Sequence, residues 1–365
     1  MDQQKQHLTA DTPDGQLQTD EMFMRRCLQL ARNGEHNAKP NPMVGAVIVS
    51  ADGRIIGEGY HVRCGQAHAE VNAFGAVRPA DEALLREATL YVSLEPCSHW
   101  GKTPPCADLI VSKRVRRVVC GCIDPFAEVQ GRGIRRIREA GIEVTVGVLE
   151  RECLELNRKF IAVNTQRRPY IILKWAETKN RMMAAAVAAP MAPMAGLLAA
   201  PVGQRPVGNQ LTRQSLVLST PFTKMLVHKL RADNDAILVG HETVNIDHPQ
   251  LNIREWSGRD PERLVLAHST EGMPRWFKCF SDIDTLLTYL KVSRKQSLIV
   301  EGGAVTLQSF IDRGLWDEIR VETAPFTVPA GVTSPTLPTE AALVRQVDFD
   351  GNIISWYEHD NTIGV

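Results

Sequence analysis

The sequence has 365 residues, of which 44% are hydrophobic, so it is long enough and apolar enough for two globular domains with cores of their own. Lysine and arginine together number 42, as do aspartate and glutamate, and a net charge of zero gives no support for a nucleic-acid or a membrane partner. Eight scattered cysteines, and an N-terminus without a basic region followed by an apolar stretch, indicate a cytoplasmic protein with reduced thiols rather than a secreted disulfide scaffold.

The first elements of the chain alternate between helix and strand. Residues 1–20 are polar and are expected to form a disordered tail, and the spacing of apolar residues predicts a helix over residues 21–34. The β-branched run MVGAVIVS predicts a strand that enters a hairpin at Asp52 and Gly53. A second helix begins at His68.

The same alternation continues to residue 150. The expected elements are a strand at 88–96, a helix at 106–113, a strand at 116–124, a helix at 133–141 and a strand at 142–148. Alternating helices and strands of this length are typical of a layered α/β domain, which we place at residues 21–150. The segment 151–166 has a helical pattern and is expected to connect this domain to the next.

A second α/β domain is expected over residues 167–365. Its predicted elements are strands at 170–176, 236–240, 263–268, 297–303 and 317–325, and helices at 223–233, 284–290 and 304–314. Two segments are expected to be loops. The alanine-rich run from Ala184 to Pro201 contains several prolines and so does not qualify as a membrane span, and the segment 329–340 is rich in proline, threonine and glycine.

Three side chains of the first domain have the types and positions of a zinc site. His68 lies at the start of a predicted helix, Cys97 at the end of a strand and Cys106 at the start of the next helix. One imidazole and two thiolates leave the fourth position of a tetrahedral Zn²⁺ for water, which is the arrangement of catalytic zinc sites. Helix N-termini also stabilise thiolates. Taken singly, each cysteine is better explained as a buried thiol, and His68 as a polar surface residue; the zinc site is predicted from the three together.

Glu70 lies two residues after His68, where it can act beside the metal without binding it. A carboxylate there can take a proton from zinc-bound water and pass it to a leaving amine, as hydrolytic deamination of a ring carbon requires. A pattern of H-x-E followed by two cysteines is typical of zinc deaminases, although the cysteines here are more widely spaced than usual. In the simplest alternative, Glu70 only stabilises the dipole of its helix. His99 is a further imidazole that we expect to bind substrate or support the site.

Several stretches of the chain are specific enough to compare with known families. In the first domain they are KPNPMVGAVIV, GEGYHVRCGQAHAEVNAF, LEPCSHWGKTPPCADLI and IDPFAEVQGRGIRRIREAGIEV; in the second they are ILKWA, LRADNDAILVGHETVNIDHPQLNIR, VEGGAVTLQSFIDRGLWDEI and TAP. Together they resemble the bifunctional deaminase/reductase family of bacterial riboflavin biosynthesis. The resemblance covers roughly residues 20–330, in the family's order of domains.

The resemblance implies a cytidine-deaminase-like α/β/α fold for the first domain and a dihydrofolate-reductase-like α/β fold for the second. The first would remove the 2-amino group of 2,5-diamino-6-ribosylamino-4(3H)-pyrimidinone 5′-phosphate, and the second would use NADPH to reduce the ribosyl group to ribityl. In the first domain, Asn41 would bind the pyrimidine, Glu70 would carry protons, and one Zn²⁺ would be held by the three ligands named above. Members of this family associate, so we also expect a homo-oligomer.

The reductase step needs donors for a 5′-phosphate and a cleft for the cofactor. Arg231 and Arg254 suit the phosphate, because guanidinium groups bind oxyanions in a bidentate way. Glu301 precedes Gly302 and Gly303, and the helix after them offers its N-terminus to a cofactor phosphate.

By motif position, the resemblance assigns substrate contacts to Lys174, Ser215, Arg231, Leu251, Arg254 and Glu301. It assigns cofactor contacts to Ala176, Val217, Thr243, Asp247 and Gly303. Without the resemblance, the two arginines are better explained as solvated surface charges, and Thr243 and Asp247 equally well as capping residues of the turn NIDHPQ.

The second domain departs from the family's pattern directly after ILKWA. The sequence ETKNRMM replaces the usual Asp-Gly turn, and an Ala/Pro-rich insertion over 184–207 precedes Ser215. The first hypothesis is therefore a two-step enzyme, and the second is a deaminase whose reductase domain serves only for binding or assembly. A third hypothesis, a structural zinc protein without chemistry, leaves Glu70 unexplained.

Overall fold

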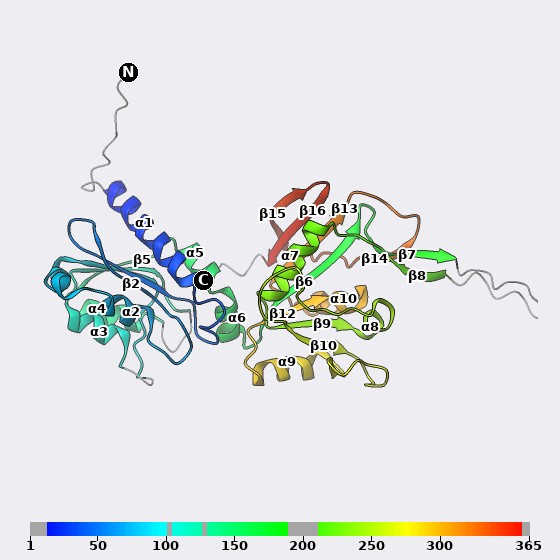
Figure 1. The fold of residues 1–365 in the computed structure, drawn as a ribbon, viewed down its shortest axis with the longest axis horizontal. Coiled ribbons are helices and arrows are strands. Elements are labelled where there is room, and N and C mark those ends of the chain that lie inside the picture. The colour runs from blue at the N-terminus through cyan, green and yellow to red at the C-terminus, as the bar shows by residue number, and fades with distance from the viewer. Residues whose placement is uncertain (1–12, 101–103, 126–129, 189–210, 360–365) are drawn as a thin grey trace, which may run out of the picture. The chain divides into compact units, whose positions relative to one another are not determined.

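Figure 1 shows the chain as a computed structural model, which describes residues 13–100, 104–125, 130–188 and 211–359. The chain forms two compact units, Met1–Arg168 and Pro169–Val365, each described by itself below. In the described parts of both units, none of the helices has the length and the hydropathy that a transmembrane span requires.

The first unit is a five-stranded sheet with helices on both faces. Its strands are β1 (Gly45–Val49), β2 (Ile55–Tyr60), β3 (Thr89–Leu94), β4 (Arg117–Cys122) and β5 (Glu143–Val146). Its helices are α1 (Pro13–Arg32), α2 (Ala69–Gly75), the 3₁₀ helix η1 (Pro79–Glu87), α3 (Cys106–Lys113), α4 (Arg132–Glu139), α5 (Glu150–Leu156) and α6 (Arg158–Gln166). In the order β2-β1-β3-β4-β5, β1 is antiparallel to both neighbours, whereas β3, β4 and β5 are parallel.

Two apolar layers hold this sheet between its helices. On one face, Met24 and Cys27 of α1 and Cys153 of α5 pack against the strands. On the other, apolar side chains of α2, α3 and α4, among them Ile110 and Ile137, form the second layer. Figure 1 shows α1 on one side of the sheet and α2, α3 and α4 on the other. The unit is therefore the α/β/α sandwich expected from the sequence.

The second unit contains two sheets, and the larger one is mostly parallel. Its strands are β6 (Tyr170–Thr178), β7 (Met182–Ala188), β8 (Leu211–Ser215), β9 (Ala236–Gly240), β10 (Glu262–Leu266), β11 (Lys278–Phe280), β12 (Ser297–Glu301), β13 (Glu318–Ala324), β14 (Gly331–Thr333), β15 (Ala341–Phe349) and β16 (Asn352–His359). Its helices are α7 (Pro221–Ala232), α8 (His241–Asp247), α9 (Ile283–Val292) and α10 (Ala304–Asp312).

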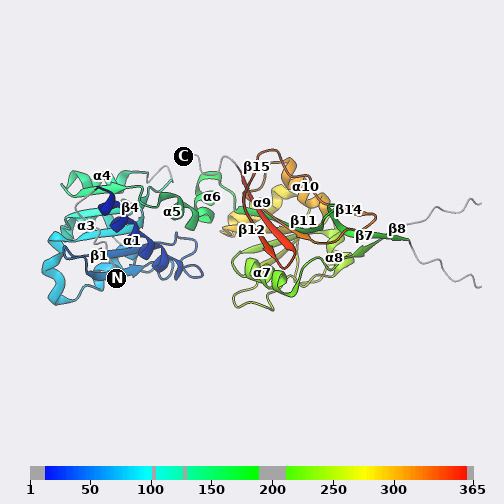
Figure 2. The same ribbon diagram turned by 90° about the horizontal axis from the view of Figure 1, so that it is seen from above.

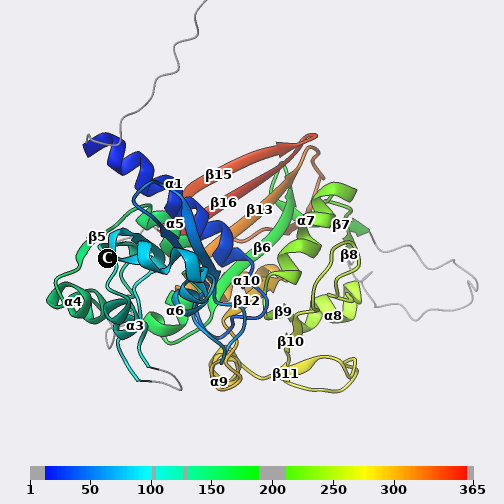
Figure 3. The same cartoon turned by 60° about the vertical axis from the view of Figure 1, so that its left-hand side comes forward.

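Eight of these strands form one sheet in the order β11-β10-β9-β12-β6-β13-β16-β15, and three form a small sheet in the order β14-β7-β8. In the large sheet, the strands from β11 to β13 are parallel, and β16 and β15 are antiparallel to their neighbours. Figure 3 shows β6, β13, β16 and β15 side by side. Apolar residues of α9 and α10 cover one face of the large sheet, and α8 and α7 cover the other (Figure 2). The unit is the predicted second α/β domain.

The N-terminal helix begins earlier than predicted. Residues 1–12 lie outside the described residues, but residues 13–20, which were expected to belong to a disordered tail, form the first turns of α1. Asp20 is buried and accepts hydrogen bonds from Arg117 at 2.7 Å and from the Tyr91 hydroxyl at 2.9 Å. The prediction was wrong because these polar residues are ordered by tertiary contacts, which an apolar pattern does not reveal.

The predicted helical connection consists of two helices, α5 and α6, with Asn157 between them. The side-chain amide of Asn157 accepts a hydrogen bond from the Met43 backbone N–H at 2.8 Å and donates one to the Met43 carbonyl at 2.9 Å. These two bonds tie the connection to the segment that precedes β1.

Both predicted loops of the second domain contain strands. Residues 184–188 of the Ala/Pro-rich run belong to β7, which pairs with β8 so that Ala184 lies opposite Ser215, and residues 189–201 lie outside the described residues. Within 329–340, β14 pairs with β7, and Gly331 lies opposite Ala185. A Cβ at Gly331 would lie 1.9 Å from the Ala184 carbonyl oxygen, so this pairing depends on glycine.

Candidate active sites

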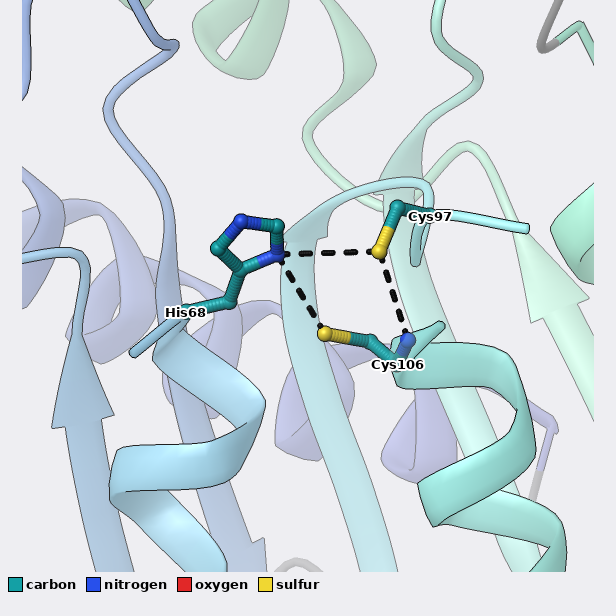
Figure 4. Close-up of side chains that lie close together, drawn as sticks. All are labelled: His68, Cys97 and Cys106. Carbon is teal, nitrogen blue, oxygen red and sulfur yellow. Dashed lines mark hydrogen bonds between the residues drawn. The ribbon is translucent and has the colours of Figure 1, made fainter. Parts of the chain in front are cut away.

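The three predicted zinc ligands lie together at the ends of three different elements. His68 directly precedes α2, Cys97 follows β3, and Cys106 is the first residue of α3. Their ligand atoms all lie within 4.8 Å of one another. His68 Nδ1 lies 3.6 Å from Cys97 Sγ and 3.4 Å from Cys106 Sγ, as Figure 4 shows.

The donor set fits Zn²⁺. Cys97 Sγ accepts a hydrogen bond from the Cys106 backbone N–H at 3.3 Å, at the start of α3. The hydrogen bond from the Cys106 thiol lowers the pKa of Cys97 to about 4, so a thiolate is present at neutral pH. One imidazole nitrogen and two sulfurs are borderline-soft donors of the kind that zinc prefers, and three protein ligands leave one position open.

Glu70 lies in the first turn of α2 and is only 3% exposed. It lines a cavity of about 620 Å³ together with His68 and Cys97. Burial raises the pKa of Glu70 to about 6. A carboxyl group with such a pKa can both accept and release a proton near neutral pH.

Asn41 and His61 also line this cavity. His61 Nδ1 lies 3.1 Å from the Ala67 carbonyl oxygen, so this nitrogen carries the proton and the other ring nitrogen is an acceptor. His61 Nε2 lies 3.1 Å from Asn41 Nδ2 and therefore accepts a hydrogen bond from that amide. The Asn41 amide is thus oriented, with its oxygen available to accept hydrogen bonds from a ligand.

His99, the remaining predicted residue of this site, is exposed and lines the same cavity. The sequence analysis missed four further lining residues that bear on the chemistry: His61, Glu95, Asp124 and Arg132. Only His61 had a local signal, since it directly follows β2 in the motif GYHVRCGQAHAE. Of the other three, Glu95 directly follows β3, Asp124 follows β4 and Arg132 begins α4.

In the second unit, Lys174, Arg231 and Glu301 form a charged cluster. Arg231 on α7 donates a hydrogen bond from Nη2 to Glu301 Oε2 at 2.7 Å, and both side chains are nearly buried. Lys174 on β6 lies opposite Glu301 on β12 and opposite Arg320 on β13. The side chains of Lys174, Glu301 and Arg320 therefore lie in one row on the same face of the sheet.

Burial and neighbouring charges set the protonation states of this cluster. Burial lowers the pKa of Lys174, although the carboxylates of Glu301 and Glu322 oppose this shift. Burial alone would raise the pKa of Glu301, but Arg231 and Lys174 more than offset it and leave that pKa below its usual value. Glu301 is therefore ionised in the folded protein at neutral pH.

Arg254 and Leu251 lie on the segment that follows α8. Arg254 is exposed, donates to Gln250 Oε1 at 2.8 Å, and its backbone N–H donates to His228 Nδ1 at 3.2 Å. Leu251 is 3% exposed and packs in the apolar layer with Val239, with a φ of +52°. The structure therefore leaves the Arg254 guanidinium accessible to a ligand, whereas the Leu251 side chain belongs to the core.

Ser215 and Val217 lie at the end of β8 and just after it. Both side chains are exposed, Val217 by 89%. Within the described parts of the chain, the Ser215 hydroxyl makes no hydrogen bond.

The predicted cofactor residues Thr243 and Gly303 lie beside each other. Gly302 and Gly303 have φ values of +122° and +62°, and a Cβ at Gly302 would lie 3.1 Å from Thr243 Cγ2. Thr243 is 7% exposed, and its hydroxyl has no hydrogen-bond partner among the residues that the structure describes. A buried hydroxyl beside a glycine turn at the start of α10 fits a ligand that approaches the backbone closely.

A cavity of about 650 Å³ lies at the N-terminal end of α10 and beyond the carboxyl ends of β9 and β10. Its lining includes His241, His268, Thr306 and Arg313, which the sequence analysis missed. This is where open parallel sheets bind nucleotides. Of the other predicted cofactor residues, Asp247 ends α8, the helix that replaces the expected turn, and Ala176 pairs with Glu322 in the sheet.

Comparison with known proteins places both units in one family. Residues 17–122 match the family model of the cytidine and deoxycytidylate deaminase zinc-binding region, and residues 207–349 match that of the RibD C-terminal domain. The chain is 34% identical over 348 residues to riboflavin biosynthesis protein RibD of Aquifex aeolicus, with 86% of this chain and 89% of that protein covered. The chain belongs to the RibD family.

Other RibD proteins give the same result. RibD of Escherichia coli is 33% identical over 352 residues, which cover 84% of this chain and 88% of that protein. A crystal structure from Thermotoga maritima is similar with a TM-score of 0.77 and 30% identity, and covers 94% of this chain and 99% of its own. That protein is described as a diaminohydroxyphosphoribosylaminopyrimidine deaminase/5-amino-6-(5-phosphoribosylamino)uracil reductase.

Membership of the RibD family confirms the prediction of a bifunctional deaminase/reductase of riboflavin biosynthesis. Both halves match, so the hypotheses of a deaminase alone and of a structural zinc protein are not favoured. The match to the zinc-binding deaminase region and the His/Cys/Cys cluster both indicate Zn²⁺ as the metal of the first unit. The RibD reductase half implies NADPH as the cofactor of the second.

Proposed function

We propose that this RibD-family chain deaminates 2,5-diamino-6-ribosylamino-4(3H)-pyrimidinone 5′-phosphate and then reduces the ribosyl group of the product to ribityl with NADPH. The likeness to the Thermotoga protein, which is named for these two activities, supports both substrates. The observation that carries the proposal is the position of Glu70, buried in one cavity with the His/Cys/Cys cluster.

In the deaminase half, we assign the metal to His68, Cys97 and Cys106. When bound, Zn²⁺ supplies a water whose pKa is lowered toward neutrality. The Glu70 carboxylate would accept a proton from the attacking water and donate it to the departing amine. Asn41 presents its amide oxygen to donors on the pyrimidine.

For the reductase half, the assigned residues fall into two groups. Arg231 and Arg254 provide guanidinium groups for the 5′-phosphate, and Lys174, Ser215, Glu301 and the backbone of Leu251, whose side chain is buried, complete the substrate side. Thr243, Asp247, Gly303, Ala176 and Val217 are assigned to the cofactor side, where NADPH supplies the hydride. The buried, unpartnered hydroxyl of Thr243 supports a cofactor contact there.

Two single variants test whether the chain has two independent active sites. In Glu70→Gln, the rate of ammonia release should fall by a factor of about 10² to 10⁴, as expected for loss of a general acid/base. The same variant should still oxidise NADPH when it is supplied with the deaminated compound. Lys174→Met should release ammonia at the wild-type rate but oxidise NADPH more slowly. If either variant loses both activities while remaining folded by circular dichroism, the assignment of two separate sites is wrong.

The proposal also assigns a role to each domain and a cellular compartment to the protein. We assign residues 21–150 to the deaminase, 151–166 to the connection and 167–365 to the reductase. A zinc site with two thiolates, and eight cysteines of which none is paired in the structure's described regions, support a reducing, cytoplasmic compartment. Cell fractionation would check this.

A homo-oligomer is supported by the outer strand of the large sheet. Strand β15 lies at the edge of that sheet, and its Leu343 and Val344 are 53% and 52% exposed. Exposed apolar edge strands commonly pair with another chain. Light scattering on a sizing column would give a mass above that of one chain; a monomer mass at all concentrations would contradict this part of the proposal.

A further inference from the structure

The deaminase cavity contains one basic side chain that the mechanism above does not use. Among the described residues that line this cavity, Arg132 is the only lysine or arginine. Glu70, Glu95 and Asp124 contribute carboxyl groups to the same lining. An anionic substrate would therefore meet a lining in which acidic groups outnumber the single permanent cation.

Arg132 is available to a ligand. It is the first residue of α4, its side chain is exposed, and no carboxylate in the described part of the chain pairs with it. Arg136, one turn further along the same helix, is instead engaged in an ion pair with Asp108. Within the described residues, no neighbouring carboxylate neutralises the charge of Arg132.

The backbone around Arg132 is held in place by Glu95. The Glu95 carboxylate is buried and accepts hydrogen bonds from the backbone N–H groups of Gly131 at 2.9 Å and Gly133 at 2.8 Å, the residues on either side of Arg132. It also accepts from Asp124 at 3.2 Å and from Ile134 at 3.4 Å. These bonds fix the start of α4 at the cavity.

The same bonds decide which group can bind an anion there. A helix N-terminus is an anion site because its first N–H groups lack partners. At α4 the N–H groups of Gly133 and Ile134 already donate to Glu95, so a substrate anion cannot use these two groups. Among the described residues of this lining, only Arg132 carries a permanent positive charge, and its guanidinium offers several hydrogen-bond donors.

We propose that Arg132 binds the 5′-phosphate of the deaminase substrate, and that the deaminase half thereby selects the phosphorylated compound over the free nucleoside. This inference rests on the proposed function. The pyrimidine lies at the metal with its ring against Asn41, and the phosphate lies at the start of α4, bound by Arg132.

The test compares phosphorylated and dephosphorylated substrate. Steady-state ammonia release would be measured for the full zinc-loaded chain, for Arg132→Met, for Arg132→Lys and for Arg135→Met, using the diaminopyrimidinone ribosyl phosphate and the same compound after phosphatase treatment. Arg135→Met is the matched control, because Arg135 is an exposed arginine on the same helix that does not line the cavity.

We expect Arg132→Met to raise KM for the phosphorylated compound by about 10- to 100-fold, the loss expected for a charge-assisted hydrogen bond, with kcat changed by less than about threefold. KM for the dephosphorylated compound should stay at the wild-type value, Arg132→Lys should restore part of the affinity, and Arg135→Met should behave as wild type.

Two results would overturn the inference and leave the proposed function intact. One is wild-type kinetics of Arg132→Met with the phosphorylated compound, and the other is an equal change of KM for both compounds. If the wild-type chain releases ammonia from neither compound, the proposed function itself fails, and the inference fails with it.

Discussion

The guanidinium of Arg231 and the carboxylate of Glu301 lie 2.7 Å apart, although 70 positions separate them in the sequence. The contact joins α7 to the end of β12, directly before the glycine turn that leads into α10. It therefore connects the proposed substrate side of the reductase half to its proposed cofactor side.

We predict that Glu301→Gln destabilises the second unit at pH 7. Removing one partner of a nearly buried pair leaves Arg231 without its counter-charge, which costs about 3 kcal/mol of unfolding free energy. Urea unfolding would measure the loss. The control is Asp284→Asn, which removes the partner of Arg313 in an exposed pair and should cost less than about 1 kcal/mol. An equal loss in both variants would contradict the account.

The pH dependence of stability should change in the same variant. The pKa of Glu301 is below its ordinary value in the folded chain, so its contribution to stability is present above the unfolded pKa and is lost as the pH falls through the folded pKa. Between pH 5 and pH 3, the unfolding free energy of wild type should fall more steeply than that of Glu301→Gln. Parallel curves would show that Glu301 does not contribute in this range.

The zinc site can be tested by removal of one ligand. Cys106→Ser should lower the zinc content measured by inductively coupled plasma mass spectrometry and abolish ammonia release, because two protein ligands do not retain a catalytic zinc. Cys279→Ser, in the second unit, is the control and should keep one zinc per chain. Full zinc content in Cys106→Ser would remove Cys106 from the ligand set.

Thr243→Val should have opposite effects on stability and on cofactor affinity. The Thr243 hydroxyl is buried without a described partner, so replacing it by a methyl group should leave unfolding free energy unchanged or raise it. If the hydroxyl binds the cofactor, KM for NADPH should rise by about tenfold. Thr288→Val, at an exposed position on α9, is the control. Unchanged KM would remove Thr243 from the cofactor side.

Glu95→Gln should destabilise the first unit. Its amide would place an NH₂ group among backbone N–H donors, and an unsatisfied buried donor costs about 1–3 kcal/mol. Urea unfolding of this variant can be compared with that of Glu139→Gln, which changes an exposed glutamate at the end of α4, the helix whose start binds Glu95. Glu95→Gln should lose more unfolding free energy than Glu139→Gln, and equal losses in the two variants would contradict the account.

The zinc site could be predicted from the sequence because its residues lie at the junctions of elements with clear local patterns. His68, Cys97 and Cys106 each adjoin a helix or strand whose bounds the apolar pattern defines, and Glu70 is fixed by its spacing from His68. Parallel strands and helix starts at one sheet edge then bring these residues together.

The remaining features depend on contacts between distant segments. Arg132 resembles any other arginine of the basic helix α4 until the four hydrogen bonds to Glu95 place it at the cavity. Asp20 orders the start of α1 through Arg117, 97 positions away. In the second unit, the exposed positions of Ser215 and Val217 follow from the pairing of β8 with β7, which the alanine-rich sequence did not reveal.

The most direct test of the two-step account is to follow ammonia release and NADPH oxidation together in one reaction of the purified chain with the diaminopyrimidinone ribosyl phosphate. We predict that ammonia appears first and that NADPH loss follows, reaching one NADPH oxidised for each ammonia released. Ammonia without any loss of NADPH would contradict the account, because the second unit would then not be a working reductase.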